Sequence, residues 1–501
     1  MCRVIILKSG RNCKMSQMKL FGSRRSAARL AKTRAPKKKK PLKKLAIFLT
    51  VILCLEGLYF FAAYTTIPFV AQLRDTYINT ALATMRHQWL ATRLLPKSVV
   101  QDVIDRNTAA AARLDGKTSS WGKTDPETPA TDEPSTDVPE QPDTTPTQPE
   151  ENTRPIDTEV QEPEPPKELT PEEIEAQEKA AFEELFWELD PETWQAYLTE
   201  HPETLDNGWS GIYINEAGLN DNGTSIYTTQ GEQVLAIDAP NKILFVRVKG
   251  SGWRGVLAIA KDPSLLCIGT SANISQGTDP FSKGSGQTVG EIVQNVEGGI
   301  LGITASGFID VSPNGVLGQG NGGRLAGYCM AQGTEYNVDY HATNSGWHKF
   351  SRMELHDDNL MYIKATTDPI SENCTDAFEF EPAMIVDGEV LVNDWWSELN
   401  PRSCIGQSDK YEILMLVIEG RGASGSWGTD IAHCAEILKN HNCEQAINVD
   451  GGASGMMWYN GEYLTRCANG VSSDGRPVPN ACVYRAAGYD SDTPSGDTQE
   501  G

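Results

Sequence analysis

The chain has 501 residues and a formal net charge of −23, a length that allows more than one domain. Residues 1–44 contain 16 of the 44 Lys and Arg residues and none of the 67 Asp and Glu residues. This distribution argues against a nucleic-acid-binding protein, because such proteins gather positive charge on a folded face. It is typical of a chain that crosses a membrane with its basic end in the cytoplasm.

Residues 45–66 form an apolar run in which Glu56 is the one charged residue. The run is long enough to cross ~30 Å of hydrocarbon, lysines precede it, and aromatic residues gather at its far end as an interface belt. We therefore predict a single transmembrane helix in the cell membrane, with residues 1–44 as a cytoplasmic tail and the rest of the chain outside. The alternative is a cleaved signal peptide, with Ala62-Ala63 as a faint cleavage site.

The next 140 or so residues fall into three segments that differ in amino-acid composition and pattern. Apolar residues at three- and four-residue steps predict a juxtamembrane helical segment over 67–118, broken near Pro96. Residues 119–170 are crowded with Pro, Glu, Asp and Thr, which predicts a disordered, extended linker. Thr170-Pro-Glu-Glu173 has the pattern of a capping box with Pro at the first helical position, so we predict a helical stalk over 171–207.

Residues 208–487 contain many short strand-like runs separated by glycines, together with a few helical patterns. Strands outnumber helices without regular alternation, which favours an α+β fold with a mixed sheet. The segment is long enough for one large core, and residues 488–501 are expected to be a disordered tail. Of the eleven cysteines, eight lie beyond residue 260, an even number compatible with disulfides whose pairing stays open.

Several chemical signatures are absent from the sequence: G-x-x-x-x-G-K-[ST], H-E-x-x-H, G-x-S-x-G and zinc-finger spacing. We predict no cofactor and no metal ligands, and a divalent metal is not excluded. Four polar segments remain, each at an expected strand end or loop. They are GITASGFID (302–310) with the following glycine-rich loop, NPRSCIG (400–406), VIEGRGAS (417–424), and NVDGGASG (448–455) with SDGRPVPN (473–480).

Among their residues are the carboxylates of Glu419 and Asp450, several arginines, and glycines that let a backbone approach a ligand. Hydrolysis of a sugar joined to an anion needs such a set, because carboxylates handle the proton and the water while arginines bind phosphate oxygens. The structural alternative for any one segment is a tight turn or a salt bridge, since Asp-Gly is also a strong hairpin signal.

The four segments, in this order, resemble the phosphodiester glycosidase family of the uncovering enzyme, whose bacterial relatives are often described as exopolysaccharide biosynthesis proteins. The resemblance covers about 209–485 and implies an α+β domain that hydrolyses a sugar-1-phosphodiester. The chain has Thr304 where the family usually has Asn, Cys404 where it has a small aliphatic residue, and Glu419 where it has Asp. It also has Gly455 near the place of a second Ser or Thr.

The resemblance implies Asp450 and Glu419 as the catalytic carboxylates, one as acid/base and the other as nucleophile or base, in an order that stays open. Arg402 and Arg421 are expected to hold the phosphate. Further binding residues are predicted on the same segments: Arg324, Asn448, Gly451, Gly452, Ser454, Ser424 and Asp310.

We therefore expect a membrane-anchored extracytoplasmic hydrolase that acts on a phosphodiester in a cell-surface polysaccharide or glycolipid and binds no nucleic acid. Two alternatives belong to other classes. The domain could bind anionic cell-envelope polymers without cleaving them, or it could be only a structural scaffold for an assembly.

Overall fold

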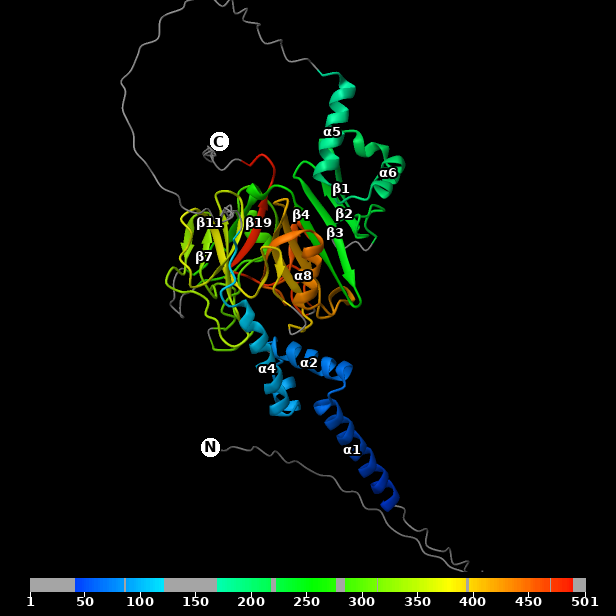
Figure 1. Cartoon of the computed structure of the whole chain (residues 1–501), viewed down its shortest axis with the longest axis vertical. Coiled ribbons are helices and arrows are strands. Elements are labelled where there is room, and N and C mark those ends of the chain that lie inside the picture. The colour runs from blue at the N-terminus through cyan, green and yellow to red at the C-terminus, as the bar shows by residue number, and fades with distance from the viewer. Residues whose placement is uncertain are drawn as a thin grey trace, which may run out of the picture. The chain divides into compact units, whose positions relative to one another are not determined.

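The computed structural model describes eight stretches of the chain (Figure 1): 41–84, 87–120, 169–217, 222–275, 284–312, 314–392, 396–468 and 470–489. Most of the predicted basic tail and linker, and almost all of the C-terminal tail, therefore lie outside the described residues. The chain divides into two compact units, Met1–Tyr59 and Phe60–Gly501.

Helix α1 (Pro41–Tyr64) contains the predicted apolar run. Within it, Lys43–Tyr64 is long and apolar enough to cross a membrane, with a mean hydropathy of 2.3. In the described part of the chain no other helix meets this criterion. The length and composition of α1 are thus compatible with a membrane anchor.

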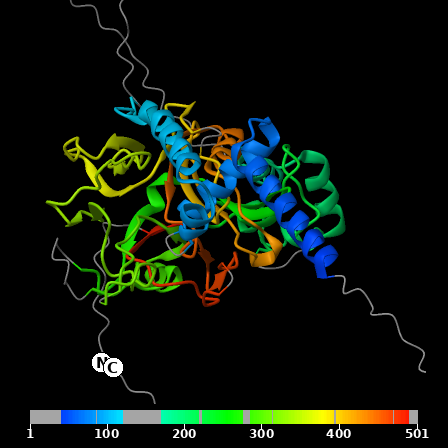
Figure 2. The same cartoon turned by 90° about the horizontal axis from the view of Figure 1, so that it is seen from below.

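Three helices follow: α2 (Pro68–Leu82), α3 (Trp89–Leu94) and α4 (Lys97–Ala111). The break between α3 and α4 falls at Pro96, because proline disfavours helical geometry in the residue before it. The helices pack around a small core of their own, formed by Ile78, Ala81, Ala91, Val99, Val100 and Val103. Figure 2 shows this group lying across one side of the larger domain.

The helical group is fastened to that domain by specific polar contacts. The amide group of Asn79 donates a hydrogen bond of 3.1 Å to Ser397 and accepts one of 2.9 Å from Asn107. Beyond α4, Ser119 donates from its backbone to the carbonyl of Ile363 at 2.8 Å and from its hydroxyl to Gln445 at 2.8 Å. Because Asn79 and Ser119 are buried, the group is part of the folded body of Phe60–Gly501.

A second helical pair, α5 (Pro171–Leu185) and α6 (Pro191–Glu200), lies beside β1 and β2 in Figure 1. The helix α5 begins with a capping box, in which Thr170 accepts from the Glu173 backbone at 3.3 Å and the Glu173 carboxylate accepts from the Thr170 backbone at 2.8 Å. Aromatic side chains of this pair are buried in the same core as one face of the largest sheet, so the pair is packed on the domain.

Three sheets are present in the described residues, and every strand pairing in them is antiparallel. The largest has the order β1-β2-β3-β4-β15-β14-β16-β12-β13, with β1 Tyr213–Asn215, β2 Gln233–Asp238, β3 Ile243–Gly250, β4 Trp253–Ala260, β12 Ala383–Val386, β13 Glu389–Val390, β14 Arg402–Ser408, β15 Ile413–Ile418 and β16 Cys443–Val449. The second has the order β18-β17-β6-β19-β5, with β5 Leu266–Thr270, β6 Gly299–Thr304, β17 Met457–Tyr459, β18 Glu462–Tyr463 and β19 Asn480–Arg485. The third has the order β10-β9-β11-β7-β8, with β7 Cys329–Ala331, β8 Thr334–Tyr336, β9 Ser351–His356, β10 Met361–Ala365 and β11 Cys374–Phe380.

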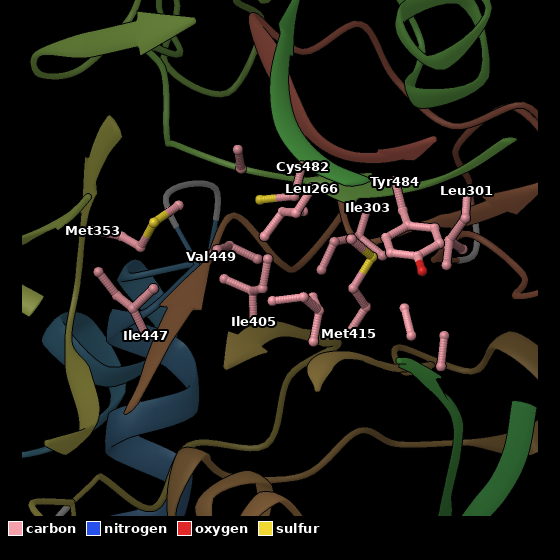
Figure 3. Packing of buried hydrophobic residues seen from close by; sticks show 14 of the residues in the cluster. Leu266, Leu301, Ile303, Met353, Ile405, Met415, Ile447, Val449, Cys482 and Tyr484 are labelled. Atoms are coloured by element: carbon pink, nitrogen blue, oxygen red, sulfur yellow. The ribbon is translucent and has the colours of Figure 1, made fainter. Parts of the chain in front are cut away.

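The strand β15 explains why its sequence is apolar at every position. Side chains alternate between the two faces of a strand, and both faces of β15 are covered. Ile413, Met415 and Val417 belong to one core, whereas Leu414, Leu416 and Ile418 belong to the other. Figure 3 shows the first core, in which Met415 and Ile405 pack near Ile303 and Tyr484 of the second sheet.

Two further helices cover the sheets: α7 (Val289–Asn295) packs on the second sheet and α8 (Ile431–Asn440) on the largest. The predicted α+β class is confirmed. The predicted mixed sheet is wrong, because every strand pairing in the described sheets is antiparallel. The nine cysteines in the described part of the chain are free thiols.

Candidate active site

The register of the largest sheet brings three of the predicted motifs to one edge. Arg402, the first residue of β14, pairs with Ile418, the last residue of β15. On the other side of β14, Ser403 pairs with Val449, the last residue of β16. The loop before β14 and the loops after β15 and β16 therefore leave the sheet together, and they carry the NPRS, EGRG and DGGAS sequences.

These loops line a cavity of about 1270 Å³. Eight of the eleven predicted site residues lie along its wall: Asp310, Arg402, Arg421, Asn448, Asp450, Gly451, Gly452 and Ser454. The structure thus brings most of the predicted set to one concave surface, which is where ligand sites are usually found.

The backbone of Asp450 is fixed by the second sheet, because its N–H donates to the Ala305 carbonyl at 2.9 Å and its carbonyl accepts from the Thr304 hydroxyl. In the carboxylate, Oδ2 is buried and has no hydrogen-bond partner in the described structure. Burial is the main cause that raises the pKa of Asp450 to about 6, and a hydrogen bond from Ser454 and the charge of Arg476 oppose it. A carboxyl with an unsatisfied oxygen and a pKa near neutrality is a candidate for proton transfer.

Two of the arginines in the cavity are bound to carboxylates. Arg402 is buried and lies 3.0 Å from a carboxylate oxygen of Glu398, and it also donates to the backbone carbonyls of Glu398 and Thr429. Arg476 makes two bonds to Asp310, of 2.8 and 2.9 Å. In both cases the positive charge is balanced inside the protein.

Arg421 has a different environment. Its guanidinium donates a hydrogen bond of 3.0 Å to the side-chain oxygen of Asn400, and no carboxylate lies within salt-bridge distance of it among the described residues. Burial, and next the charge of Arg402, lower the pKa of Arg421. Its backbone is left-handed, with φ of 52°. Arg421 is therefore a cation without a carboxylate partner at the cavity wall.

The double glycine after Asp450 allows a close approach between the two loops. A Cβ on Gly451 would lie 2.7 Å from the Pro401 carbonyl oxygen, and Gly452 has a φ of 58° and lies against the guanidinium of Arg421. Side chains at these positions would push the Asp450 turn away from Arg421, so the glycines hold the two groups at the same wall.

The carboxylate of Glu419 lies elsewhere, and Glu419 is not among the residues that line the cavity. Its Oε1 accepts a hydrogen bond of 2.7 Å from the Arg466 backbone, and its Oε2 lies 3.4 Å from Nε of Arg254. The side chain is 1% exposed. The strand end is where the sequence predicts it, but the side chain is not part of the cavity wall.

Arg324 and Ser424 are likewise absent from the cavity wall. Ser424 has a φ of 49°, and its buried hydroxyl has no hydrogen-bond partner in the described structure. The backbone carbonyl of Arg324 accepts from Ile309 at 2.9 Å, which ties the glycine-rich segment to the motif that ends in Asp310.

The cavity also has walls that the site prediction omitted. Arg476 belongs to the SDGRPVPN segment, so its motif was recognised although the residue was not selected. Glu398 and Glu381 add carboxylates, and half-buried aromatic residues add apolar surface. Further lining residues come from the end of α2, the connection after it and the start of α3: Tyr77, Thr80, Ala81, Leu82, Ala83, Thr84, His87, Gln88 and Leu90. No sequence signal placed these residues beside motifs more than 200 positions away.

No group of three or more His, Cys, Asp and Glu side chains in the described stretches is arranged to hold a metal ion.

Comparison with known proteins agrees with the motifs. Residues 297–485 match the family model described as phosphodiester glycosidase, which confirms the predicted family resemblance. The catalytic domain of zebrafish N-acetylglucosamine-1-phosphodiester alpha-N-acetylglucosaminidase, auto-inhibited by its pro-peptide, has 14% identity and a TM-score of 0.37, and the alignment covers 48% of this chain and 82% of that one. No curated protein matches the sequence.

Two further solved structures are similar at the same level. A hypothetical protein from Synechocystis has 13% identity and a TM-score of 0.31, with 49% of this chain and 62% of that chain covered. A putative exported protein from Burkholderia pseudomallei has 13% identity and a TM-score of 0.31, with 46% and 74% covered.

Proposed function

We propose that this chain is a hydrolase that cleaves the glycosidic bond of a sugar-1-phosphodiester. The observation that carries the proposal is the pairing of two groups at one cavity wall: a buried Asp450 carboxyl with an unpartnered oxygen, and Arg421, a guanidinium without a carboxylate partner. The family match over 297–485 supports the same class of reaction.

In the proposed reaction, the bond between the anomeric carbon and the phosphate oxygen breaks, and the oxygen of water bonds to that carbon. One proton of the water goes to Asp450, and the second stays on the new sugar hydroxyl. The leaving group is a phosphate monoester, whose second pKa is ~6. It therefore departs as a stable anion near neutral pH and needs little help from a general acid.

This chemistry assigns Asp450 the role of the base that takes up the proton of the attacking water. A base must be ionised to act, and a pKa near the working pH makes it efficient. Its raised pKa of about 6 fits that role better than an ordinary surface carboxylate would.

We assign to Arg421 the binding of the phosphate group. Negative charge grows on the phosphate oxygens as the bond to the sugar breaks, and a guanidinium already held in place stabilises that charge without reorganisation. Arg402 and Arg476 have carboxylate partners of their own, so we assign them to positioning the loops that carry Asn400 and Asp310.

Glu419 is assigned a structural role. Its carboxylate receives the Arg466 backbone N–H and faces Arg254, and the Glu419 side chain is 1% exposed. In this proposal Glu419 fixes the segment around Arg466 against the end of β15, and it does not exchange protons with substrate.

We further propose that α1 is a single-pass anchor, with its basic end in the cytoplasm and the folded domain outside. The support is the apolar helix Lys43–Tyr64 together with the lysines that precede it, because positive residues are retained on the cytoplasmic side.

The test of the function is product release by the full chain, purified in detergent, from a panel of sugar-1-phosphodiesters that differ in the sugar. The expected result is equal amounts of free sugar and phosphate monoester from at least one of them. A panel without release, under conditions where the chain is folded, would contradict the proposal. Asp450→Asn is the control for contaminating activity.

A further inference from the structure

The surface of α2 has an apolar stripe that the fold itself does not use. Phe69, Leu73 and Tyr77 follow one another at four-residue steps, so they lie on one face of the helix. They are 69%, 56% and 41% exposed, respectively. The buried Ile78 lies on the opposite side of α2. Ala81, one four-residue step beyond Tyr77, is buried in the helical core, so the exposed stripe extends from Phe69 to Tyr77 and ends there.

One end of the stripe adjoins the end of the apolar helix. The residues Thr65, Thr66 and Ile67 alone separate α1 from α2. Arg74 fixes this junction, because its guanidinium donates to the carbonyls of Ala63 and Thr65 at 3.1 and 3.2 Å. Phe69 therefore lies within a few residues of the point where a membrane-spanning helix would leave the bilayer.

The other end of the stripe opens into the candidate active site. Tyr77 is itself part of the cavity wall, and its hydroxyl donates to the Leu90 carbonyl at 3.3 Å. The wall continues from there with apolar side chains: Leu82, Leu90, Trp347, Phe350, Phe380, Trp396 and Leu399. The same cavity contains Asp450 and Arg421, so the stripe that begins near the α1 junction reaches, at Tyr77, the cavity that holds these polar groups.

A substrate that is wholly carbohydrate would gain little from such a path, since exposed apolar surface of this kind marks a binding site for an apolar partner. We propose that the phosphodiester has a lipid as its second ester, and that the stripe on α2 receives the hydrocarbon chain of that lipid. The inference rests on the proposed function and names its substrate class, a glycosyl phospholipid drawn from the same membrane. From Phe69 to Tyr77 the helix rises ~12 Å, enough to cover the first part of a long alkyl chain.

Polar contacts with neighbouring segments hold α2, and with it the stripe, in place. Asp75 receives the guanidinium of Arg106 from α4 at 2.8 Å, and Asn79 is buried between Asn107 and Ser397. Because these contacts fix the position of α2, the exposed stripe stays next to the cavity.

The test compares two esters of N-acetylglucosamine 1-phosphate, one methyl and one decyl, with the full chain in phosphatidylcholine nanodiscs. The quantity measured is the ratio of kcat/KM for the decyl ester to that for the methyl ester. Burial of several methylene groups should raise this ratio to at least ~10 in the wild-type chain. The double variant Phe69→Gln/Leu73→Gln should lose most of that preference.

The matched control is Ile174→Gln, which changes an apolar residue that is 45% exposed on α5 and is absent from the cavity wall. It should leave the ratio as in the wild type. Partitioning of the decyl ester into the nanodisc is the same for every variant, so a difference between variants reports the stripe.

A wild-type ratio near one would overturn the lipid inference, and so would an equal ratio in the double variant and the wild type. In both cases hydrolysis of the methyl ester would still support the proposed function. A double variant that changes only self-association or membrane attachment would assign the stripe to a second copy or to the bilayer, and it would also overturn the inference. If neither ester is hydrolysed, the panel of sugar-1-phosphodiesters decides the proposed function. Direct binding of the two esters then decides the lipid inference: stronger binding of the decyl ester that the double variant loses supports it, and equal binding overturns it.

Discussion

The guanidinium of Arg421 donates a hydrogen bond of 3.0 Å to the neutral side chain of Asn400. This contact fixes the direction of the guanidinium, and no carboxylate in the described residues lies within salt-bridge distance of it. Arg402 and Arg476, in the same cavity, are each paired with a carboxylate. The three arginines therefore divide into one candidate ligand for phosphate and two that hold the structure.

The first prediction follows from this division. Arg421→Gln should lower kcat/KM by ~10² or more, because it removes a charge that stabilises the developing phosphate anion, while Tm changes little. Arg402→Gln should instead destabilise the fold by about 3–5 kcal/mol, since it leaves the buried Glu398 without its partner. Thermal unfolding and initial rates on both variants test the division, and a loss of stability in Arg421→Gln alone would contradict it.

The second prediction concerns pH. Burial raises the pKa of Asp450 to about 6, and the base must be ionised, so kcat/KM should rise roughly tenfold per pH unit below pH 6 and level off above it. Glu419→Gln is the control and should keep the same profile. A rate that falls as the pH rises through 6 would identify Asp450 as an acid instead.

The same pKa has a consequence for stability. The folded pKa of Asp450 is above the unfolded value of ~3.9, so the folded state binds the proton more tightly between these two values. The free energy of unfolding contributed by this group is therefore fully present below pH ~4 and is lost as the pH rises through 6. Asp450→Asn should raise Tm relative to the wild type at pH 7 more than at pH 4, as measured by calorimetry.

The third prediction separates Glu419 from catalysis. Glu419→Gln keeps an oxygen for the Arg466 N–H and removes the charge that faces Arg254, so it should cost on the order of 3 kcal/mol of stability. The kcat of the protein that remains folded should be nearly that of the wild type. A large loss of kcat at unchanged Tm would return Glu419 to the catalytic set.

The fourth prediction concerns the helical group that precedes the linker. A chain that begins at residue 169 lacks α2–α4 and the contacts of Ser119 with Ile363 and Gln445. It should have a lower Tm than a chain that begins at residue 67, and a lower kcat/KM, because one wall of the cavity is gone. Equal values for the two chains would show that the group is only a spacer.

The sequence predicted the strand ends of the site well, for a physical reason. Continuous apolar runs such as Leu414–Ile418 indicate strands covered on both faces, and the polar residue after each run must fall at the edge of the sheet. Antiparallel pairing of β14 with β15 and β16 then brings Arg402 and Asp450 to one edge. The apolar runs thus predicted the strand ends, whereas the pairing of the strands is known from the structure.

The sequence did not predict the direction in which a side chain at a strand end points. Glu419 and Asp450 both follow an apolar strand, and each precedes a glycine, yet one carboxylate faces Arg254 and the other lines the cavity. The partners that decide this, Arg254 and Arg466, come from distant segments without a motif. The wall formed by α2 was missed for the same reason, since Asn79 meets Ser397 across more than 300 positions.

The most direct test of the central claim is the fate of the water oxygen. The full chain hydrolyses a sugar-1-phosphodiester in ¹⁸O-labelled water, and the masses of both products are measured by mass spectrometry. Asp450→Asn is the inactive control. Cleavage of the glycosidic bond predicts that the label enters the sugar and that the phosphate monoester contains none. A label found in the phosphate would show attack at phosphorus, and it would contradict the assignment of this chain as a phosphodiester glycosidase.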